Sequence, residues 1–306
     1  MTKAKNKLLA AFIVAIITVV TVMFIVPPAD ASAEVEDGSV FSKGNGTEGD
    51  PYQISTVEQL NQLAQLVSLG NTNYTDKIYE LTANIDLDGK AWTPIGTKSD
   101  PFAGTFDGNG HIIKNLTLTG DEAGLFGYND GTIRNVYLDE VNISSTGGGV
   151  AALCYQNNTD ATIECCAVLG GSINAVGNYG TAAGICSSNH GEINKCYNMA
   201  AVSTQYKGAG IVYNNCAKGT VSNCYNAGEV SAIYNSTQAS YIAGICASNY
   251  EIIKNCLNFG EVITAPSDSY DSYGSYGAGI LCFGYLGTVT NCYSDSDVCR
   301  DRKSVV

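Results

Sequence analysis

The chain has 306 residues, of which 16 are Lys or Arg and 29 are Asp or Glu, and its formal net charge at pH 7 is −13. Nucleic acids and anionic lipid surfaces bind basic protein faces, so this charge balance argues against both as partners. The length allows one or two domains, but a continuous sequence repeat favours one elongated body.

The first 33 residues have the order of a secretory signal peptide. Lys3, Lys5 and Lys7 precede the unbroken apolar run Leu8–Val26, and a small-residue cleavage site ends at Ala33. We therefore expect export, with the mature chain extracellular or on the cell surface. The alternative is an uncleaved membrane anchor, because the apolar run is long enough to span a bilayer. In that case this run is the only expected contact with a membrane.

Residues 34–50 separate the signal peptide from the rest of the chain. They are acidic, rich in Gly and nearly free of apolar side chains. A segment that cannot bury apolar surface does not fold, so we expect a flexible acidic linker here.

Residues 51–78 contain one amphipathic helix, expected from about Thr56 to Leu69. Ser55 and Glu58 have the spacing of a capping box, and Gly70 stands where a helix ends. Apolar residues recur between them at helical spacing: Val57, Leu60, Leu63, Ala64 and Val67. We expect this helix to cap the N-terminal end of the repeats that follow.

Residues 79–300 are repetitive. The motif GTVSNCYN at 219–226 recurs as GEINKCYN (191–198), EIIKNCLN (251–258) and GTVTNCYS (287–294), with looser copies at 131–138 and 161–168. The third residue after the Ile or Val of each copy forms one column: Val136, Cys166, Cys196, Cys224, Cys256 and Cys292. A repeat of about 30 residues in strand-type sequence predicts a solenoid.

The solenoid is expected to be all-β, a right-handed parallel β-helix with the one N-terminal helix as its cap. The column begins one copy earlier with Leu116, three residues after Ile113, so Val, Leu and Cys share it, which indicates an inward apolar position. The residue before the column is Asn in five copies, and Asn tolerates the left-handed backbone of a tight corner. These residues are Asn115, Asn135, Asn223, Asn255 and Asn291. Residues 79–88 alternate with period two and predict one half-buried strand.

Several segments together resemble the secreted GLUG-motif proteins. They are GNGTEGDPYQISTVEQLNQLAQLV (44–67), YELTANIDLDG (79–89), FAGTFDGNGHIIKNLTL (102–118) and GLFGYNDGTIRNVYL (124–138). The resemblance implies a right-handed β-helix of Gram-positive surface proteins, such as the non-catalytic N-terminal region of immunoglobulin A-specific metallopeptidases and adhesin-like proteins. Later repeats depart from it by carrying Cys where Gly-Leu-Phe-Gly has Phe. The family has no common catalytic motif to transfer.

The twelve cysteines are expected to be mostly free thiols. Side chains stacked in one column keep their Cβ atoms near the strand spacing of about 4.8 Å, which is too long for a relaxed disulfide. Some bridges remain an alternative. A metal site is a weaker alternative because no Cys-x-x-Cys pair is present, and we expect neither a metal nor a cofactor.

No catalytic residues are assigned. His111 follows Asp107-Gly-Asn-Gly, and His190 lies in Ser-Asn-His-Gly, so both histidines are expected in turns. Asp86 and Asp88 share the outer face of one expected strand. Clustered carboxylates could serve a carbohydrate-active enzyme or a calcium ion, but a solvated edge is the commoner reason for such a pair.

Tyrosines concentrate near two long insertions at 231–243 and 264–278. Insertions at one place per repeat project from one side of a solenoid, and Tyr among Ser and Gly is typical of adaptable binding surfaces. The candidate ligand-binding residues are Tyr234, Tyr241, Tyr270, Tyr273 and Tyr276. The alternative is that these insertions are mobile, solvated loops. We expect a monomeric adhesin-like binding or spacer module for an extracellular glycan, matrix or cell-wall polymer.

Two alternatives to the binding module remain open. One is a carbohydrate-active β-helix enzyme, a lyase or hydrolase. The other is the stalk of a larger surface protein, because residues 301–306 fit no repeat and match one reading frame of a common sequencing adapter. We expect this tail to be non-native and the natural sequence to be interrupted near Cys299.

Overall fold

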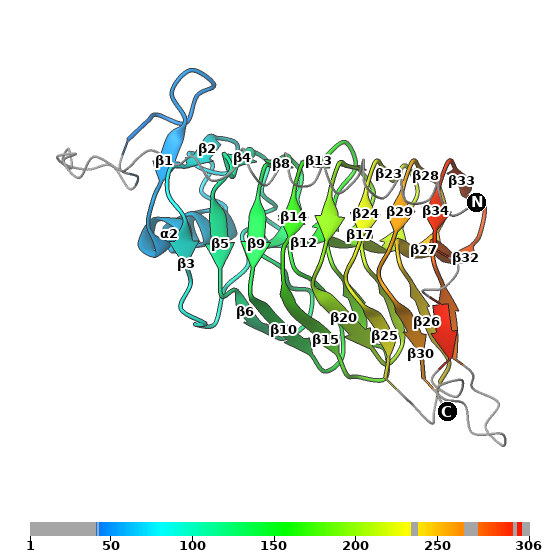
Figure 1. Ribbon diagram of the computed structural model, residues 1–306. Coiled ribbons are helices and arrows are strands. Elements are labelled where there is room, and N and C mark those ends of the chain that lie inside the picture. Colours follow the sequence, from blue (N-terminus) through cyan, green and yellow to red (C-terminus); the bar gives the residue numbers. More distant parts are fainter. Residues whose placement is uncertain (1–40, 42, 234–237, 266–274, 296–298, 302–306) are drawn as a thin grey trace, which may run out of the picture. The chain divides into compact units, whose positions relative to one another are not determined.

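A computed structural model describes residue 41 and residues 43–233, 238–265, 275–295 and 299–301 (Figure 1). The chain divides into two compact units, Met1–Gly38 and Ser39–Val306, and every described residue belongs to the second unit. The expected signal peptide and residues 302–306 of the expected tail lie outside the described residues.

The second unit is a parallel β-helix of about seven turns with one helix near its N-terminal end (Figure 1). Each turn adds one strand to each of several parallel sheets, so strands far apart in sequence lie side by side. The expected all-β solenoid with one N-terminal helix is confirmed.

The strands form five sheets. The nine-stranded sheet contains β1 (Tyr52–Ile54), β2 (Ile78–Leu81), β4 (Thr105–Asp107), β8 (Thr132–Arg134), β13 (Thr162–Glu164), β18 (Glu192–Asn194), β23 (Thr220–Ser222), β28 (Ile252–Lys254) and β33 (Thr288–Thr290). The eight-stranded sheet contains β3 (Ile85–Asp86), β5 (Ile112–Lys114), β9 (Tyr137–Asp139), β14 (Ala167–Val168), β19 (Tyr197–Asn198), β24 (Tyr225–Asn226), β29 (Leu257–Asn258) and β34 (Tyr293–Ser294).

The remaining three sheets complete each turn. The seven-stranded sheet contains β6 (Thr117–Thr119), β10 (Val141–Ser145), β15 (Gly171–Ala175), β20 (Ala201–Thr204), β25 (Val230–Ala232), β30 (Val262–Thr264) and β35 (Cys299–Asp301). The five-stranded sheet contains β11 (Gly149–Ala151), β16 (Thr181–Ala183), β21 (Lys207–Ala209), β26 (Ser240–Ala243) and β31 (Ser275–Ala278). The six-stranded sheet contains β7 (Phe126–Asn129), β12 (Cys154–Asn157), β17 (Cys186–Asn189), β22 (Val212–Asn215), β27 (Cys246–Asn249) and β32 (Leu281–Gly284).

The helix α2 (Val57–Ser68) buries its apolar stripe in the same core cluster as the first strands. Its N-cap is Thr56, whose Oγ1 accepts a hydrogen bond from the backbone N–H of Gln59. The prediction of a capping box between Ser55 and Glu58 was wrong. The helix begins one residue later, so Gln59 takes the third position, and its Oε1 accepts from the N–H of Ser55.

The coil also begins earlier than expected. β1 pairs in parallel with β2, so the sheet starts at Tyr52 rather than at residue 79. Phe41, in the expected flexible linker, is buried, and its ring lies 4.9 Å from that of Tyr52 and 5.4 Å from that of Tyr79. The single aromatic side chain in this segment anchors it to the coil end. The expected strand over residues 79–88 is interrupted and forms β2 and β3.

The cysteine column is confirmed as an inward, stacked position. The neighbouring strand residues Ile163, Ile193 and Val221 are in direct register and fully buried. Of the six column residues from Val136 to Cys292, five are buried, and Cys292 on the last of these turns is half-buried. The eleven cysteines whose side chains the structure describes carry free thiols.

The buried thiols are held in the protonated form. Burial raises the pKa of Cys246 to about 12, and a hydrogen bond with Cys224 raises the pKa of Cys256 to about 12. The thiolate is the reactive and metal-binding form of cysteine, so these residues act as small apolar side chains.

The corner before the column has the expected left-handed backbone. All five corner asparagines have φ between 52° and 57°, and Cys165 and Lys195 adopt the same conformation at φ 54°. The Asn255 amide donates to Asn223 Oδ1 at 3.2 Å, and the Asn291 amide donates to Asn255 Oδ1 at 3.3 Å. Amide stacking along the axis is therefore present at this exposed corner.

Two further asparagine ladders lie in the interior, and the sequence analysis missed them. In the longer ladder, each side-chain amide donates to the Oδ1 of the next turn at 2.8 or 2.9 Å. Its members are all fully buried: Asn129, Asn157, Asn189, Asn215 and Asn249. In the shorter ladder, Asn198 donates to Asn226 and Asn226 donates to Asn258, both at 2.9 Å.

Replacing Cys224 by Val should lower the free energy of unfolding by less than about 1.5 kcal/mol, because Val already occupies this column at another turn. Replacing it by Asp should cost at least about 2 kcal/mol, because the carboxylate has no partner there. Urea unfolding of both variants measures the difference. A large loss for Val would show that the thiol has a specific role.

Alkaline pH should destabilise the protein. The unfolded chain releases its thiol protons near the ordinary pKa of 9.0, whereas folded Cys246 and Cys256 hold theirs to about 12. The contribution of these two thiols to the free energy of unfolding is therefore fully present below pH 9 and is lost as the pH rises toward 12. Melting temperatures across this range should fall less steeply for Cys246→Val than for the wild type, and equal slopes would contradict this origin.

Replacing Asn189 by Ala should destabilise the coil by about 1–3 kcal/mol, because the N–H of Gly191 and the amide of Asn157 lose their buried acceptor. The exposed Asn142 on β10 provides a matched control, and Asn142→Ala should change stability by less than about 0.5 kcal/mol. Equal losses for the two variants in urea unfolding would remove the ladder from the account.

Candidate functional site: an aromatic cluster and a polar notch

Two of the predicted ligand-binding tyrosines are described, and they lie together. Tyr241 on β26 and Tyr276 on β31 are direct register partners. Their rings stack at a centroid distance of 5.2 Å with an interplanar angle of 6°. Tyr234, Tyr270 and Tyr273 lie outside the described residues, so their part in the site stays a prediction.

The stacked pair belongs to a larger set of rings on the outside of the last turns. Tyr179 contacts Tyr206, which contacts Tyr241, at 5.8 and 6.4 Å. Phe283 lies 4.7 Å from Tyr241 and 6.1 Å from Tyr285. Tyr285 stacks on Tyr250 at 4.3 Å. We call these seven rings the aromatic cluster: Tyr179, Tyr206, Tyr241, Tyr250, Tyr276, Phe283 and Tyr285.

The cluster is accessible and carries one cation. Tyr179 is 70% exposed, Tyr276 53% and Tyr285 51%. The Lys207 ammonium lies 5.0 Å from the Tyr206 ring centroid and 5.7 Å from that of Tyr241. Such a cation–π contact holds the lysine on the ring faces. The surface is therefore largely apolar, with phenol hydroxyls and one ammonium group.

The register of the coil assembles this cluster. Thr181, Lys207, Tyr241 and Tyr276 occupy the same outward position on successive turns. The sequence contains a signal for it that was missed, because a Tyr comes shortly before the small-small-Ile segment of four successive repeats. Seeing these tyrosines as neighbours requires the register, since the connections between them differ in length.

Beneath the cluster, Tyr213 is half-buried on β22. Burial raises its pKa to about 12, with further contributions from Tyr206, Cys216 and Tyr250. Burial also raises the pKa of Tyr241. At neutral pH these phenols are uncharged, and their hydroxyl groups can both donate and accept hydrogen bonds.

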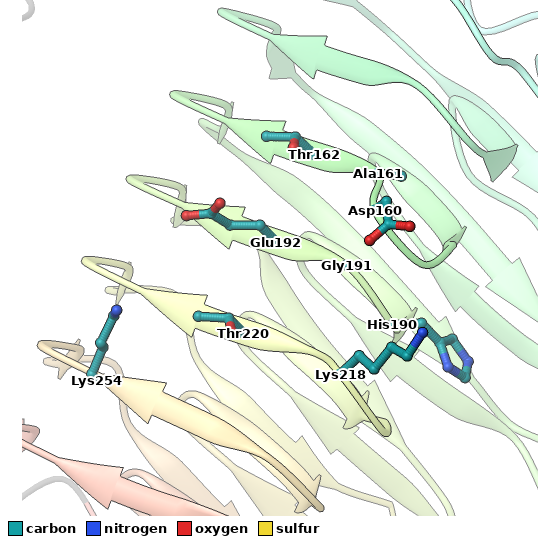
Figure 2. Close-up of a pocket in the computed structure, with 9 residues that line it drawn as sticks. All are labelled: Asp160, Ala161, Thr162, His190, Gly191, Glu192, Lys218, Thr220 and Lys254. Atoms are coloured by element: carbon teal, nitrogen blue, oxygen red, sulfur yellow. The ribbon is translucent and has the colours of Figure 1, made fainter.

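A polar notch lies on the corner between the six-stranded and nine-stranded sheets (Figure 2). Its lining includes two carboxylates, two ammonium groups and one histidine from neighbouring turns: Asp160, His190, Glu192, Lys218 and Lys254. Figure 2 shows Asp160, His190 and Lys218 on the loops, whereas Glu192 and Lys254 project from β18 and β28. Burial lowers the pKa of His190, so its imidazole is neutral at pH 7.

The other candidate chemical groups are engaged in structural contacts. Asp107 accepts from the N–H of Asn109 at 2.8 Å and from Arg134 Nε at 2.7 Å, which confirms the turn before His111. Asp86 accepts the corner amide of Asn115 at 2.7 Å. Asp88 has a left-handed backbone and an ion pair with Lys90 at 3.4 Å. Among the described residues, no group of three or more potential ligands has metal-site geometry.

Of the helices that the structure describes, none is long and apolar enough to cross a membrane. The apolar run Leu8–Val26 lies outside the described residues. The choice between a cleaved signal peptide and an anchor therefore stays a prediction.

Sequence comparison finds partial matches to much longer proteins. No family model matches the chain. A "Putative Gly-rich membrane protein" of Evansella cellulosilytica is 31% identical over 156 residues, which are 49% of this chain and 17% of that protein. Halomucin of Haloquadratum walsbyi is 35% identical over 138 residues, which are 39% of this chain and 1% of halomucin. The chain thus spans a small part of the length of these curated relatives.

Structure comparison extends over nearly the whole chain. A crystal structure described as a "putative immunoglobulin A1 protease from Bacteroides ovatus" matches with a TM-score of 0.70 and 25% identity, covering 90% of this chain and 86% of that one. A second structure, named "IgA1 Protease", matches with a TM-score of 0.53 and 14% identity over 79% of this chain and 21% of that one, and it shows the fold alone. The expected resemblance to the β-helix of immunoglobulin A protease-like proteins is confirmed.

Proposed function

We propose that this protein is an exported or cell-surface β-helix module that binds an extracellular glycan through the aromatic cluster. The observation that carries the proposal is the contiguous series of seven rings on the outside of the last turns. Scattered exposed apolar residues need no explanation, but a contiguous exposed patch points to a binding surface.

The chemistry of the cluster suits a sugar chain. Tyrosine combines a flat apolar face with a hydroxyl group, so it can contact the C–H face of a sugar and hydrogen-bond its hydroxyls. Tyr276 stacks one face on Tyr241, and no other described ring covers its second face. On the sides where rings are stacked on each other, they expose only their edges and hydroxyl groups to a ligand. Tyr276 is therefore the leading stacking contact, with Tyr285 and Phe283 beside it.

Binding is better supported than catalysis. A β-helix enzyme acting on carbohydrate through acid–base chemistry needs carboxylates gathered on one flank. At equivalent positions of the described strands, carboxylates recur on at most two successive turns, as with Glu80 and Asp107, before Arg134 follows. Aromatic residues, by contrast, occupy neighbouring positions over the last turns. The enzyme remains the alternative hypothesis.

The location rests on independent observations. The N-terminal sequence has the order of a secretory signal peptide. The partial relatives include a protein named as a membrane protein and a protein named halomucin. The β-helix resembles that of proteins described as immunoglobulin A1 proteases. A non-catalytic module of a larger surface protein accounts for all three.

The test is a glycan and matrix-protein array probed with the mature protein. The wild type should bind a subset of glycans, and a Tyr276→Ala/Tyr285→Ala double variant should lose at least about tenfold in affinity, equivalent to about 1.4 kcal/mol. Both side chains are more than half exposed, so the fold should persist.

The matched control is Tyr293→Ala, which removes an exposed tyrosine on β34, outside the cluster. It should bind as the wild type does. Equal binding by the double variant and the wild type would place the site elsewhere. Binding to matrix proteins alone would show that the ligand is a protein rather than a glycan. The absence of any binding would favour a module that serves only as a spacer.

A further inference from the structure

The polar notch owes its shape to an alternation in loop length. The loops that follow the longer asparagine ladder are short after Asn129, Asn189 and Asn249, where the side-chain amide donates to the carbonyl two residues later. After Asn157 and Asn215 the amide donates to the carbonyl four residues later, so these loops are longer. The short loop of His190 therefore lies between two longer neighbours.

The residues at the tips of the longer loops flank His190. Asp160 and Lys218 have left-handed backbones, with φ of 67° and 71°. Both line the same notch as His190 (Figure 2). A second depression, lined by Asp130, Asn158 and His190 among others, adjoins the notch on its N-terminal side. The longer asparagine ladder fixes the start of each loop, whereas the loops differ in length and in the residues at their tips.

The notch and the aromatic cluster lie along the same corner of the coil. Backbone hydrogen bonds place one residue per turn in a row along this corner. The row runs Asn158, His190, Cys216, Tyr250 and Tyr285. Three strand spacings separate His190 from Tyr285, which is roughly 14 Å along the axis. A ligand that contacts both ends is longer than one sugar ring and lies parallel to the axis.

The lining suits an uncharged, hydroxyl-rich ligand. The notch is lined by the carboxylates of Asp160 and Glu192, the ammonium groups of Lys218 and Lys254, and the neutral imidazole of His190. The formal charges of the notch thus cancel. Carboxylates accept hydrogen bonds, ammonium groups donate them, and imidazole does both, so this set can satisfy hydroxyl groups along a sugar chain.

We propose that the notch around His190 is a second subsite for a neutral oligosaccharide whose chain runs along this corner from the aromatic cluster. The inference rests on the proposed glycan-binding function and extends it to ligand class, length and direction. The aromatic rings supply apolar contact at one end, and the notch supplies directional hydrogen bonds at the other.

The experiment uses length-matched neutral probes, cellobiose with cellohexaose and mannobiose with mannohexaose, and hexagalacturonate as an acidic probe. Calorimetric titration of the wild type should give tighter binding for a neutral hexasaccharide than for its disaccharide or for hexagalacturonate. His190→Ala and Lys218→Ala should each weaken hexasaccharide binding about tenfold. Both variants should leave disaccharide binding unchanged, because a disaccharide occupies the aromatic cluster alone.

His111→Ala is the matched control, because His111 is also a turn histidine of lowered pKa but does not line the notch. It should bind both lengths as the wild type does. If Tyr276→Ala/Tyr285→Ala weakens hexasaccharide binding but the notch variants do not, the second subsite is wrong and the proposed function stands. Preference for hexagalacturonate would overturn the neutral class. If none of the probes binds, the second subsite is overturned, and glycan binding by the aromatic cluster is overturned as well if the glycan array is also empty.

Discussion

The buried hydrogen bonds between asparagine side chains on successive turns constrain the rest of this structure. A buried amide without partners costs free energy, so the interior Asn residues of successive turns must stay in direct register if each is to bond the next. The ladder from Asn129 to Asn249 meets this condition at every step. Hydrophobic packing alone would tolerate a shift in register between similar turns. The amide ladder does not, because such a shift would break its buried hydrogen bonds.

The fixed register determines what the outer surface can present. Inward positions repeat apolar residues, and outward positions stack whatever the sequence supplies one strand spacing apart. Tyr241 therefore meets Tyr276, and Tyr250 meets Tyr285. Loops of unequal length leave from the same ladder and create the notch at His190. A rigid interior thus carries a variable exterior, which suits a binding module.

Much of the fold could be predicted from sequence because the inward column and the corner have narrow physical requirements. Val, Leu and Cys exchange at the column, and Asn repeats where the backbone is left-handed. The buried asparagines were missed because Asn between strand segments is typical of turns, and their pairing with Asn of neighbouring turns cannot be seen without the register. Phe41 was missed because a single aromatic residue in an acidic segment gives no periodicity. The aromatic cluster was found only in part, because its members come from connections of different length.

The central claim is tested most directly by hydrogen exchange of the asparagine side-chain amides in a ¹⁵N-labelled protein transferred to D₂O. If the ladder fixes the register, the side-chain amide protons of Asn157, Asn189 and Asn215 persist as long as the slowest backbone amides of the core strands, since both exchange only when the coil opens. The exposed Asn142 side chain supplies the fast reference. Exchange of the ladder amides as fast as that of Asn142 would contradict the account.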